Sequence, residues 1–131
     1  MDIKTSHTRL LVVDLEACFE FYRDVMEFPV VMESLEDGYA EFSIPGMKLS
    51  LFRRQEMAQM IGSDRPPVTV ECQDKVSLIF TVTNLDEVYH HLKTKGVNFV
   101  TDPLNNPYYA LKTVYLRDPD DTLIGLFQPM M

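Results

Sequence analysis

Apolar and polar residues fall into a strand pattern and then a helix pattern at the start of the chain. Residues 3–13 are rich in large and β-branched apolar side chains, which predicts a β-strand. Asp14 follows, and its carboxylate can accept the free backbone N–H groups of a first helical turn. Apolar residues then recur at spacings of three and four, so that they share one face of a helix that Pro29 ends. They are Leu15, Cys18, Phe19, Tyr22, Val25 and Met26.

Three further strands are expected after this helix, at residues 30–35, 39–44 and 47–52. Asp37-Gly38 and Pro45-Gly46 separate them, and both pairs are strong turn signals. Residues 55–61 suit a short helix. The sequence Gly-Ser-Asp-Arg-Pro-Pro that follows from Gly62 suits a linker.

The same order of patterns then returns. A strand is expected at residues 76–83, and Asn84 stands at the helix start, with Glu87 three residues on in a capping-box arrangement. The second helix carries apolar side chains on one face, and Gly96 suits its left-handed end. Strands are expected at 97–101, 111–116 and 122–127, with a turn at 118–121. The apolar face of the second helix consists of Leu85, Val88, Tyr89 and Leu92.

Two modules of strand–helix–strand–strand–strand order in one chain indicate an α+β fold. The expected division is module 1 at about residues 3–54, a linker at about 55–75 and module 2 at about 76–129, within one domain spanning 1–131. Few positions are identical between the modules, so the repeat lies in the order and register of elements.

Charge excludes some partners. Asp and Glu outnumber Lys and Arg by 20 to 12, giving a net charge of −8. Nucleic acid and anionic membrane surfaces both select clustered Lys and Arg, so neither is an expected partner. The apolar run 10–13 is too short for a membrane span or an export signal. Cys18 and Cys72 form no Cys-x-x-Cys pair or disulfide framework, so we expect a cytoplasmic protein with reduced thiols.

Two segments carry a resemblance to a known family. Residues 13–24, Val-Asp-Leu-Glu-Ala-Cys-Phe-Glu-Phe-Tyr-Arg-Asp, resemble the opening segment of the glyoxalase / bleomycin-resistance / extradiol dioxygenase (vicinal oxygen chelate) proteins. Residues 116–126, Leu-Arg-Asp-Pro-Asp-Asp-Thr-Leu-Ile-Gly-Leu, resemble that family's closing segment, in which Arg117 and Asp118 shape a turn. The resemblance implies that the two βαβββ modules form a half-open curved sheet, or barrel, around a ligand, and it implies a homodimer.

The resemblance also places the positions at which enzymes of this family hold a divalent metal. They are His7, Ser50, Ser77 and Gly125. Gly125 stands where the closing segment usually has Glu. One imidazole cannot supply the three protein ligands of a typical catalytic site, and serine hydroxyls are poor ligands for transition metals. We therefore expect no cofactor, with a divalent metal held by His7, Glu41 and a further ligand as the alternative. His90 and His91 fall off the apolar face of the second helix and should face water.

Alternation along the strands assigns side chains to the helix side or to the interior of the curved sheet. Leu10 and Val12 are expected on the helix side, whereas Lys48 and Ser50 face the interior. The interior mixes aromatic and aliphatic walls with few polar groups, as small-molecule pockets do. The candidate ligand-binding residues are His7, Arg9, Glu41, Phe52, Ser77, Ile79, Thr113, Tyr115 and Phe127.

Several of these residues have two interpretations. The Arg9 guanidinium needs a partner, which is either Glu41 or an anionic ligand. His7 and Tyr115 are the candidate catalytic groups, although His7 also suits a hydrogen-bonded structural role and Tyr115 also suits filling the mouth of the barrel. Tyr108 and Tyr109 suit a lid or a dimer contact. Cys18 suits an inert core thiol.

Three functions remain open. The first is a protein that binds a small organic molecule without a metal, similar to the bleomycin-resistance branch of the family. The second is a divalent-metal-dependent lyase or dioxygenase of the same superfamily. The third is an interaction module whose interior is filled by its own side chains. The sequence leaves open which ligand is bound, whether catalysis occurs, and whether one chain or a dimer builds the pocket.

Overall fold

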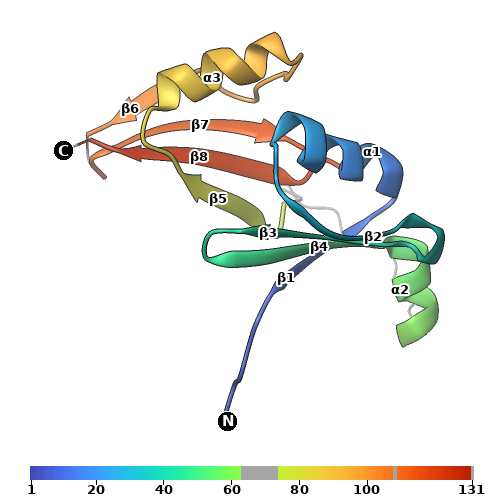
Figure 1. The fold of residues 1–131 in the computed structure, drawn as a ribbon. Coiled ribbons are helices and arrows are strands. Elements are labelled where there is room, and N and C mark those ends of the chain that lie inside the picture. Colours follow the sequence, from blue (N-terminus) through green and yellow to red (C-terminus); the bar gives the residue numbers. More distant parts are fainter. Residues whose placement is uncertain (63–73, 108, 131) are drawn as a thin grey trace. The chain divides into compact units, whose positions relative to one another are not determined.

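The chain folds into two compact units, Met1–Pro67 and Val68–Met131, in a computed structural model that describes residues 1–62, 74–107 and 109–130. Each unit has a four-stranded sheet, with strand order β1-β4-β3-β2 in unit 1 and β5-β8-β7-β6 in unit 2. Figure 1 shows α1 across one face of the first sheet and α3 across one face of the second. This α+β architecture of two βαβββ modules is the expected one.

Unit 1 begins with a strand and a helix and continues as a meander of three strands. The first strand pairs in parallel with the last, and the remaining pairs are antiparallel. A π-helical turn extends the first helix, and a short 3-10 turn joins the second and third strands. The elements are β1 (Thr8–Val12), α1 (Leu15–Glu20), the π turn (Phe21–Val25), β2 (Val30–Ser34), the 3-10 turn (Leu35–Asp37), β3 (Tyr39–Ile44), β4 (Met47–Arg53) and α2 (Arg54–Ile61).

Unit 2 repeats this topology, again with a parallel pair between its first and last strands. Its elements are β5 (Ser77–Thr81), α3 (Leu85–Thr94), β6 (Leu104–Asn106), β7 (Leu111–Arg117) and β8 (Leu123–Pro129). The residues expected to form the linker fall partly in 63–73, which lie outside the described residues.

Helices α1 and α3 begin where the sequence predicts. The Asp14 side chain accepts from the backbone N–H of Ala17 at 3.0 Å, and Asn84 accepts from that of Glu87 at 3.2 Å. Each cap satisfies one of the backbone donors that the first helical turn leaves unpaired. Gly96 follows α3 with φ +87°, the left-handed conformation expected there.

The core of unit 1 lies between α1 and one face of its sheet. Phe19, Tyr22 and Phe28 surround Phe42 of β3, with ring centroids 5.6, 6.0 and 6.4 Å from that of Phe42. Because successive residues of a strand point to opposite faces, burial of this set turns the alternate positions away from the helix. The sheet residues of this core are Leu10, Val12, Ala40, Phe42, Leu49 and Leu51.

Two predicted strands begin at other positions. The first starts at Thr8, which pairs with Leu49, instead of residue 3. In this parallel register residues 3–5 lie beyond Met47, where the partner strand β4 begins, so they have no strand residue to pair with. His7 therefore lies just before β1, not on it. Residues 97–101 form only one bridge, from Phe99 to Leu116, and the strand that pairs with β7 is Leu104–Asn106.

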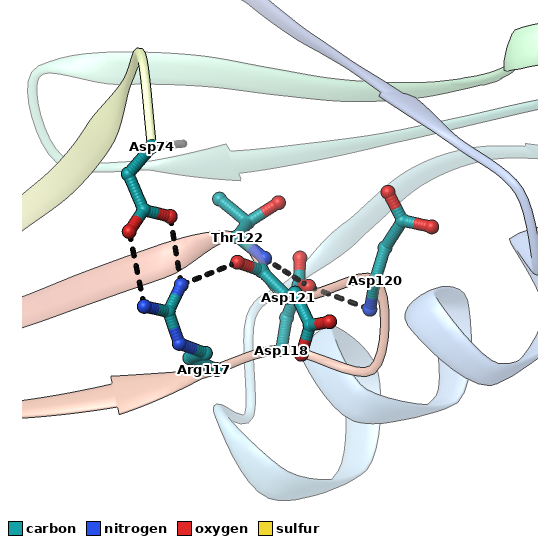
Figure 2. Close-up of polar contacts among 6 residues, drawn as sticks. All are labelled: Asp74, Arg117, Asp118, Asp120, Asp121 and Thr122. Atoms are coloured by element: carbon teal, nitrogen blue, oxygen red, sulfur yellow. Dashed lines mark hydrogen bonds and ion pairs between the residues drawn. The ribbon is translucent and has the colours of Figure 1, made fainter. Parts of the chain in front are cut away.

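The turn before β8 is held by polar side chains, as Figure 2 shows. Asp118 is 3% exposed, and its Oδ1 accepts from the backbone N–H groups of Asp120 and Thr122 at 2.8 and 2.9 Å. Arg117 binds both carboxylate oxygens of Asp74, at 2.7 and 3.0 Å, and donates to the carbonyl of Asp121 at 2.8 Å. The expectation that Arg117 and Asp118 shape this turn is confirmed.

Within the described ranges, no helix has both the length and the apolar character needed to cross a bilayer. Cys18 is buried in the core of unit 1, on the apolar face of α1. Cys72 lies outside the described residues.

Candidate functional site

Strand pairing in unit 1 gathers polar side chains on the face of the sheet that points away from α1. Arg9 of β1 pairs with Ser50 of β4, which pairs with Glu41 of β3, so these three side chains share one face. Phe52 and Tyr39 pair one step along and lie on the same face. We call Arg9, Tyr39, Glu41, Lys48, Ser50 and Phe52 the Arg9 cluster.

Glu41 is the buried acid of the Arg9 cluster, with only 12% of its side chain exposed. The Tyr39 hydroxyl donates to its Oε1 at 2.6 Å, and Lys48 Nζ lies 3.5 Å from its Oε2. The hydrogen bond from Tyr39 is the main reason that the pKa of Glu41 is lowered, with burial opposing and the positive charges of Lys48 and His7 adding to the effect. Glu41 is therefore a carboxylate whose charge is already balanced.

The Tyr39 hydroxyl in turn becomes harder to ionise. Burial and the hydrogen bond to Glu41 raise its pKa, and hydrogen bonding with Ser50 and Arg9 opposes that rise. The Tyr39 hydroxyl thus keeps its proton and donates a hydrogen bond to the Glu41 carboxylate, which fixes the orientation of both side chains.

Arg9 is held by a hydroxyl and two aromatic rings. Its Nε donates to Ser50 Oγ at 3.4 Å, and its guanidinium carbon lies 5.5 Å from the ring centre of Tyr39 and 5.1 Å from that of Phe52. Ser50 is fully buried, whereas Arg9 is exposed. The sequence left Glu41 or an anionic ligand as the partner of Arg9. In the structure Glu41 is bound by Tyr39 and Lys48.

The corresponding face of unit 2 is mostly apolar. Ile79 of β5 pairs with Gly125 of β8, and Tyr115 of β7 pairs with Gly125 from the other side. The Tyr115 and Phe127 rings meet edge to face at 5.9 Å. Ser77 is exposed beside Leu123, and Thr113 is partly buried beside Phe127.

Side chains from three strands close over Gly125. A Cβ atom at this position would lie 2.8 Å from Ile79 Cδ1 and 2.9 Å from ring carbons of both Phe127 and Tyr115. These distances are shorter than van der Waals contact, so no side chain fits at position 125 without displacing its neighbours.

The four positions implied for a metal were tested against this geometry, each within its own unit. His7 is an exposed imidazole, the buried hydroxyl of Ser50 accepts from Arg9, and Ser77 offers only an exposed hydroxyl. Gly125 offers no ligand atom, and its surroundings are filled. Nowhere in residues 1–62, 74–107 and 109–130 do three or more His, Cys, Asp or Glu side chains gather as metal ligands do. These positions do not fit a catalytic divalent metal.

The sequence interpretation missed Tyr39 as a member of the site. Tyr39 precedes Glu41 by two residues on the same strand, so the alternation that placed Glu41 would also have placed Tyr39. Lys48 was placed on this face without a role, and the structure makes it the ion-pair partner of Glu41. His90 and His91 are exposed on α3, as expected. Tyr109 is 66% exposed, and Tyr108 lies outside the described residues.

Comparison with known proteins agrees with this topology. The family model of the glyoxalase-like domain matches residues 6–131. The chain belongs to the glyoxalase-like domain family. The resemblance noted in the two sequence segments is thereby confirmed, and so is the fold expected from it.

Relatives of this glyoxalase-like chain include proteins with and without a functional name. The chain is 32% identical to a protein of Bacillus subtilis (strain 168) described as uncharacterized protein YraH, covering 96% of this chain and 98% of that protein. It is 26% identical to a bleomycin resistance protein of Geobacillus stearothermophilus, covering 91% of this chain and 92% of that protein.

Solved structures show the same fold. A glyoxalase / bleomycin resistance protein / dioxygenase from Nocardioides superposes with a TM-score of 0.75 at 23% identity, covering 99% of this chain and 87% of that one. A lactoylglutathione lyase from Agrobacterium tumefaciens superposes with a TM-score of 0.73 at 21% identity, covering 97% and 95%. At these identities the likeness concerns the fold alone, since one fold carries many chemistries.

Proposed function

We propose that this glyoxalase-like protein binds a small organic molecule without a catalytic metal and so sequesters it. The observation that carries the proposal is the Arg9 cluster, in which a buried hydroxyl and a buried carboxylate share one sheet face with an exposed guanidinium and two aromatic rings. Ligand sites combine apolar and aromatic surface with a few fixed polar groups in this way.

Two further observations support binding over metal-dependent catalysis. The sealed surroundings of Gly125 and the buried Ser50 leave the family's metal positions without suitable ligands. The similarity to bleomycin resistance proteins extends over nine-tenths of the chain. A metal-dependent lyase or dioxygenase would need ligands that these positions do not supply, so we propose that the protein needs no cofactor.

The wider setting belongs to the same proposal. We expect a homodimer in the cytoplasm, with a small molecule as ligand and neither nucleic acid nor membrane as partner. Sedimentation velocity at micromolar concentration checks the dimer, and a monomer at all concentrations would contradict it.

A thermal-melting screen tests the binding function. Purified full-length protein is melted with bleomycin and with a fragment library that spans acidic, basic and neutral aromatic compounds. A ligand at 100 times its dissociation constant stabilises the folded state by about 2.7 kcal/mol, which shifts melting by several degrees for a domain of this size. A hit should also shift the NMR resonances of Ser50 and Phe52. If no compound shifts melting, the filled interaction module replaces the binding protein as the leading hypothesis.

A further inference from the structure

Three arginines in the described part of the chain are paired with carboxylates. Arg23 binds both oxygens of Asp24 at 2.7 and 2.9 Å, Arg53 pairs with Glu56 at 2.9 Å, and Arg117 binds Asp74. Arg9 donates instead to the neutral hydroxyl of Ser50, through Nε. Its charge is therefore balanced by the faces of two rings and not by a carboxylate.

The geometry at Arg9 also leaves some of its N–H donors available. The bond to Ser50 uses Nε, and the rings of Tyr39 and Phe52 lie near the guanidinium carbon. Arg9 also hydrogen-bonds with the Tyr39 hydroxyl. A guanidinium carries five N–H donors, so these two hydroxyls leave donors for a ligand on a residue that is exposed. A planar guanidinium of this kind, held at its stem, can bind a carboxylate through two parallel hydrogen bonds.

The charges around Arg9 favour an anion as its partner. Glu41 is the acid of this face, and its oxygens are already bound by the Tyr39 hydroxyl and by Lys48. Arg9 and Lys48 against Glu41 leave this cluster with a surplus of positive charge, in a chain whose net charge is −8. Acids elsewhere in the chain weaken this attraction at long range, so selection for an anion must come from contact at short range.

Aromatic surface lies beside the charge. The Tyr39 and Phe52 rings have centroids 6.4 Å apart and an interplanar angle of 68°, and the Arg9 guanidinium lies over both rings. An aromatic or other flat apolar group attached to the anion would extend across this surface, since ring pairs add attraction beyond the area they bury.

We propose that the Arg9 cluster is a carboxylate-binding site and that the small molecule bound by this protein is an aromatic carboxylate, with Arg9 as its anchor. This inference rests on the proposed binding function and makes it specific. Lys48 and Tyr39 serve as positioning residues, because they hold Glu41 in its paired state and keep it from neutralising Arg9.

A series of three ligands with one ring system tests the charge preference. The unaltered full-length protein is titrated with 2-naphthoate, 2-naphthamide and 2-naphthamidine at pH 7.5 and followed by the amide resonances of β1, β3 and β4. Charge-assisted bonds are about twice as strong as neutral ones, so naphthoate should bind at least about tenfold more tightly than naphthamide, and naphthamidine should bind most weakly.

Two arginine variants test whether the preference for naphthoate over naphthamide depends on Arg9. Arg9→Met should remove the advantage of naphthoate over naphthamide and leave the affinity for naphthamide within about twofold. Arg23→Met is the matched control, because Arg23 also lies over a ring, that of Phe19 at 5.0 Å, but is bound by Asp24. It should leave all three affinities unchanged, and melting curves of both variants check that they fold.

The outcomes separate this inference from the binding function. Equal binding of the three compounds, or tighter binding of the amidine, overturns the carboxylate site and leaves small-molecule binding in place. A naphthoate preference that survives Arg9→Met also overturns it. If none of the three perturbs the resonances of this face, the carboxylate site is overturned, and the melting screen decides separately whether the protein binds a small molecule. Because the comparison of ligands uses the unaltered protein, it decides the question even if Arg9→Met does not fold.

Discussion

At the scale of single residues, the Arg9 cluster is ordered by one buried carboxylate. Glu41 is stabilised as an anion by a phenol and an ammonium from its own sheet, and this leaves Arg9 to stack on rings. Removing a hydrogen-bond donor from a buried carboxylate lowers stability by more than the net contribution of that hydrogen bond, because the carboxylate stays buried without its partner.

Tyr39→Phe should raise the pKa of Glu41 and destabilise the protein by about 1–3 kcal/mol at pH 7. The folded-state pKa of Glu41 is lowered, so its contribution to stability is present above the pKa of the unfolded chain and is lost as the pH falls through the folded-state pKa. The difference between Tyr39→Phe and the parent should therefore shrink below about pH 4.

Urea unfolding from pH 3 to 7, with an NMR titration of the Glu41 carboxyl carbon, measures both effects. Tyr115→Phe is the control, because Tyr115 lies on the sheet of unit 2. An unchanged titration midpoint for Glu41 in Tyr39→Phe would show that the Tyr39 hydroxyl does not hold the carboxylate.

In unit 2, Gly125 is a position at which a single residue decides the packing of the sheet face. Gly125→Ala should destabilise the protein by about 1–3 kcal/mol, because its Cβ would meet Ile79, Phe127 and Tyr115 at under 3 Å. Ile79→Val removes the closest of these atoms, Cδ1, so the double variant should recover part of the loss. Urea unfolding of the parent, the two single variants and the double variant gives the coupling energy between positions 79 and 125. Strictly additive losses of stability would contradict this packing.

At the scale of elements, the turn between β7 and β8 depends on a side chain in place of a backbone partner. Asp118→Ala should cost about 2 kcal/mol or more in urea unfolding, because the N–H groups of Asp120 and Thr122 lose their acceptor. Asp118→Asn keeps an oxygen at that place and should lose less than half as much. Equal losses in the two variants would show that the charge, and not the acceptor, matters.

The strand boundaries that differed from expectation depend on whether a neighbouring strand is present to pair with. Residues 3–7 contain one apolar residue, Ile3, and the predicted strand reached back to it from the apolar run 10–13. The partner strand β4 starts only at Met47, so residues 3–5 have no strand residue to pair with. Around residue 100, the backbone bonds singly to β7 through Val100, and Thr101 accepts from Tyr115 with its side chain. Propensity alone does not show whether a neighbouring strand is present to pair with.

At the scale of the whole molecule, the absence of suitable metal ligands at the expected positions predicts how the protein responds to metals. Chelator-treated protein titrated with Zn²⁺, Ni²⁺, Mn²⁺ or Fe²⁺ should melt within about 1 °C of the untreated protein, since a saturated site would shift melting by several degrees. His7→Ala should behave as the parent does. If a metal shifted the melting temperature by several degrees and His7→Ala abolished that shift, the metal-dependent enzyme would replace the binding protein as the leading hypothesis.

The sequence by itself determined the order of elements, the helix caps and the sheet faces. Asp14 and Asn84 mark helix starts through local hydrogen bonds, and period-two alternation separates the core position Leu10 from the outward Arg9. Gly125 already stood out, because a family position lacked its usual side chain. The caps and the alternation depend on neighbours within a few residues, so a linear pattern carries them, whereas Gly125 stood out through the family resemblance.

Only the tertiary structure decided which polar groups pair across strands. Arg9 and Glu41 are 32 positions apart in the chain, and sequence left their pairing open. Strand register brings Ser50 between them and lets Tyr39 and Lys48 bind the carboxylate instead. The space around Gly125 is likewise filled from three strands. Pairing and packing across strands follow from register and side-chain shape together, which no stretch of the sequence contains.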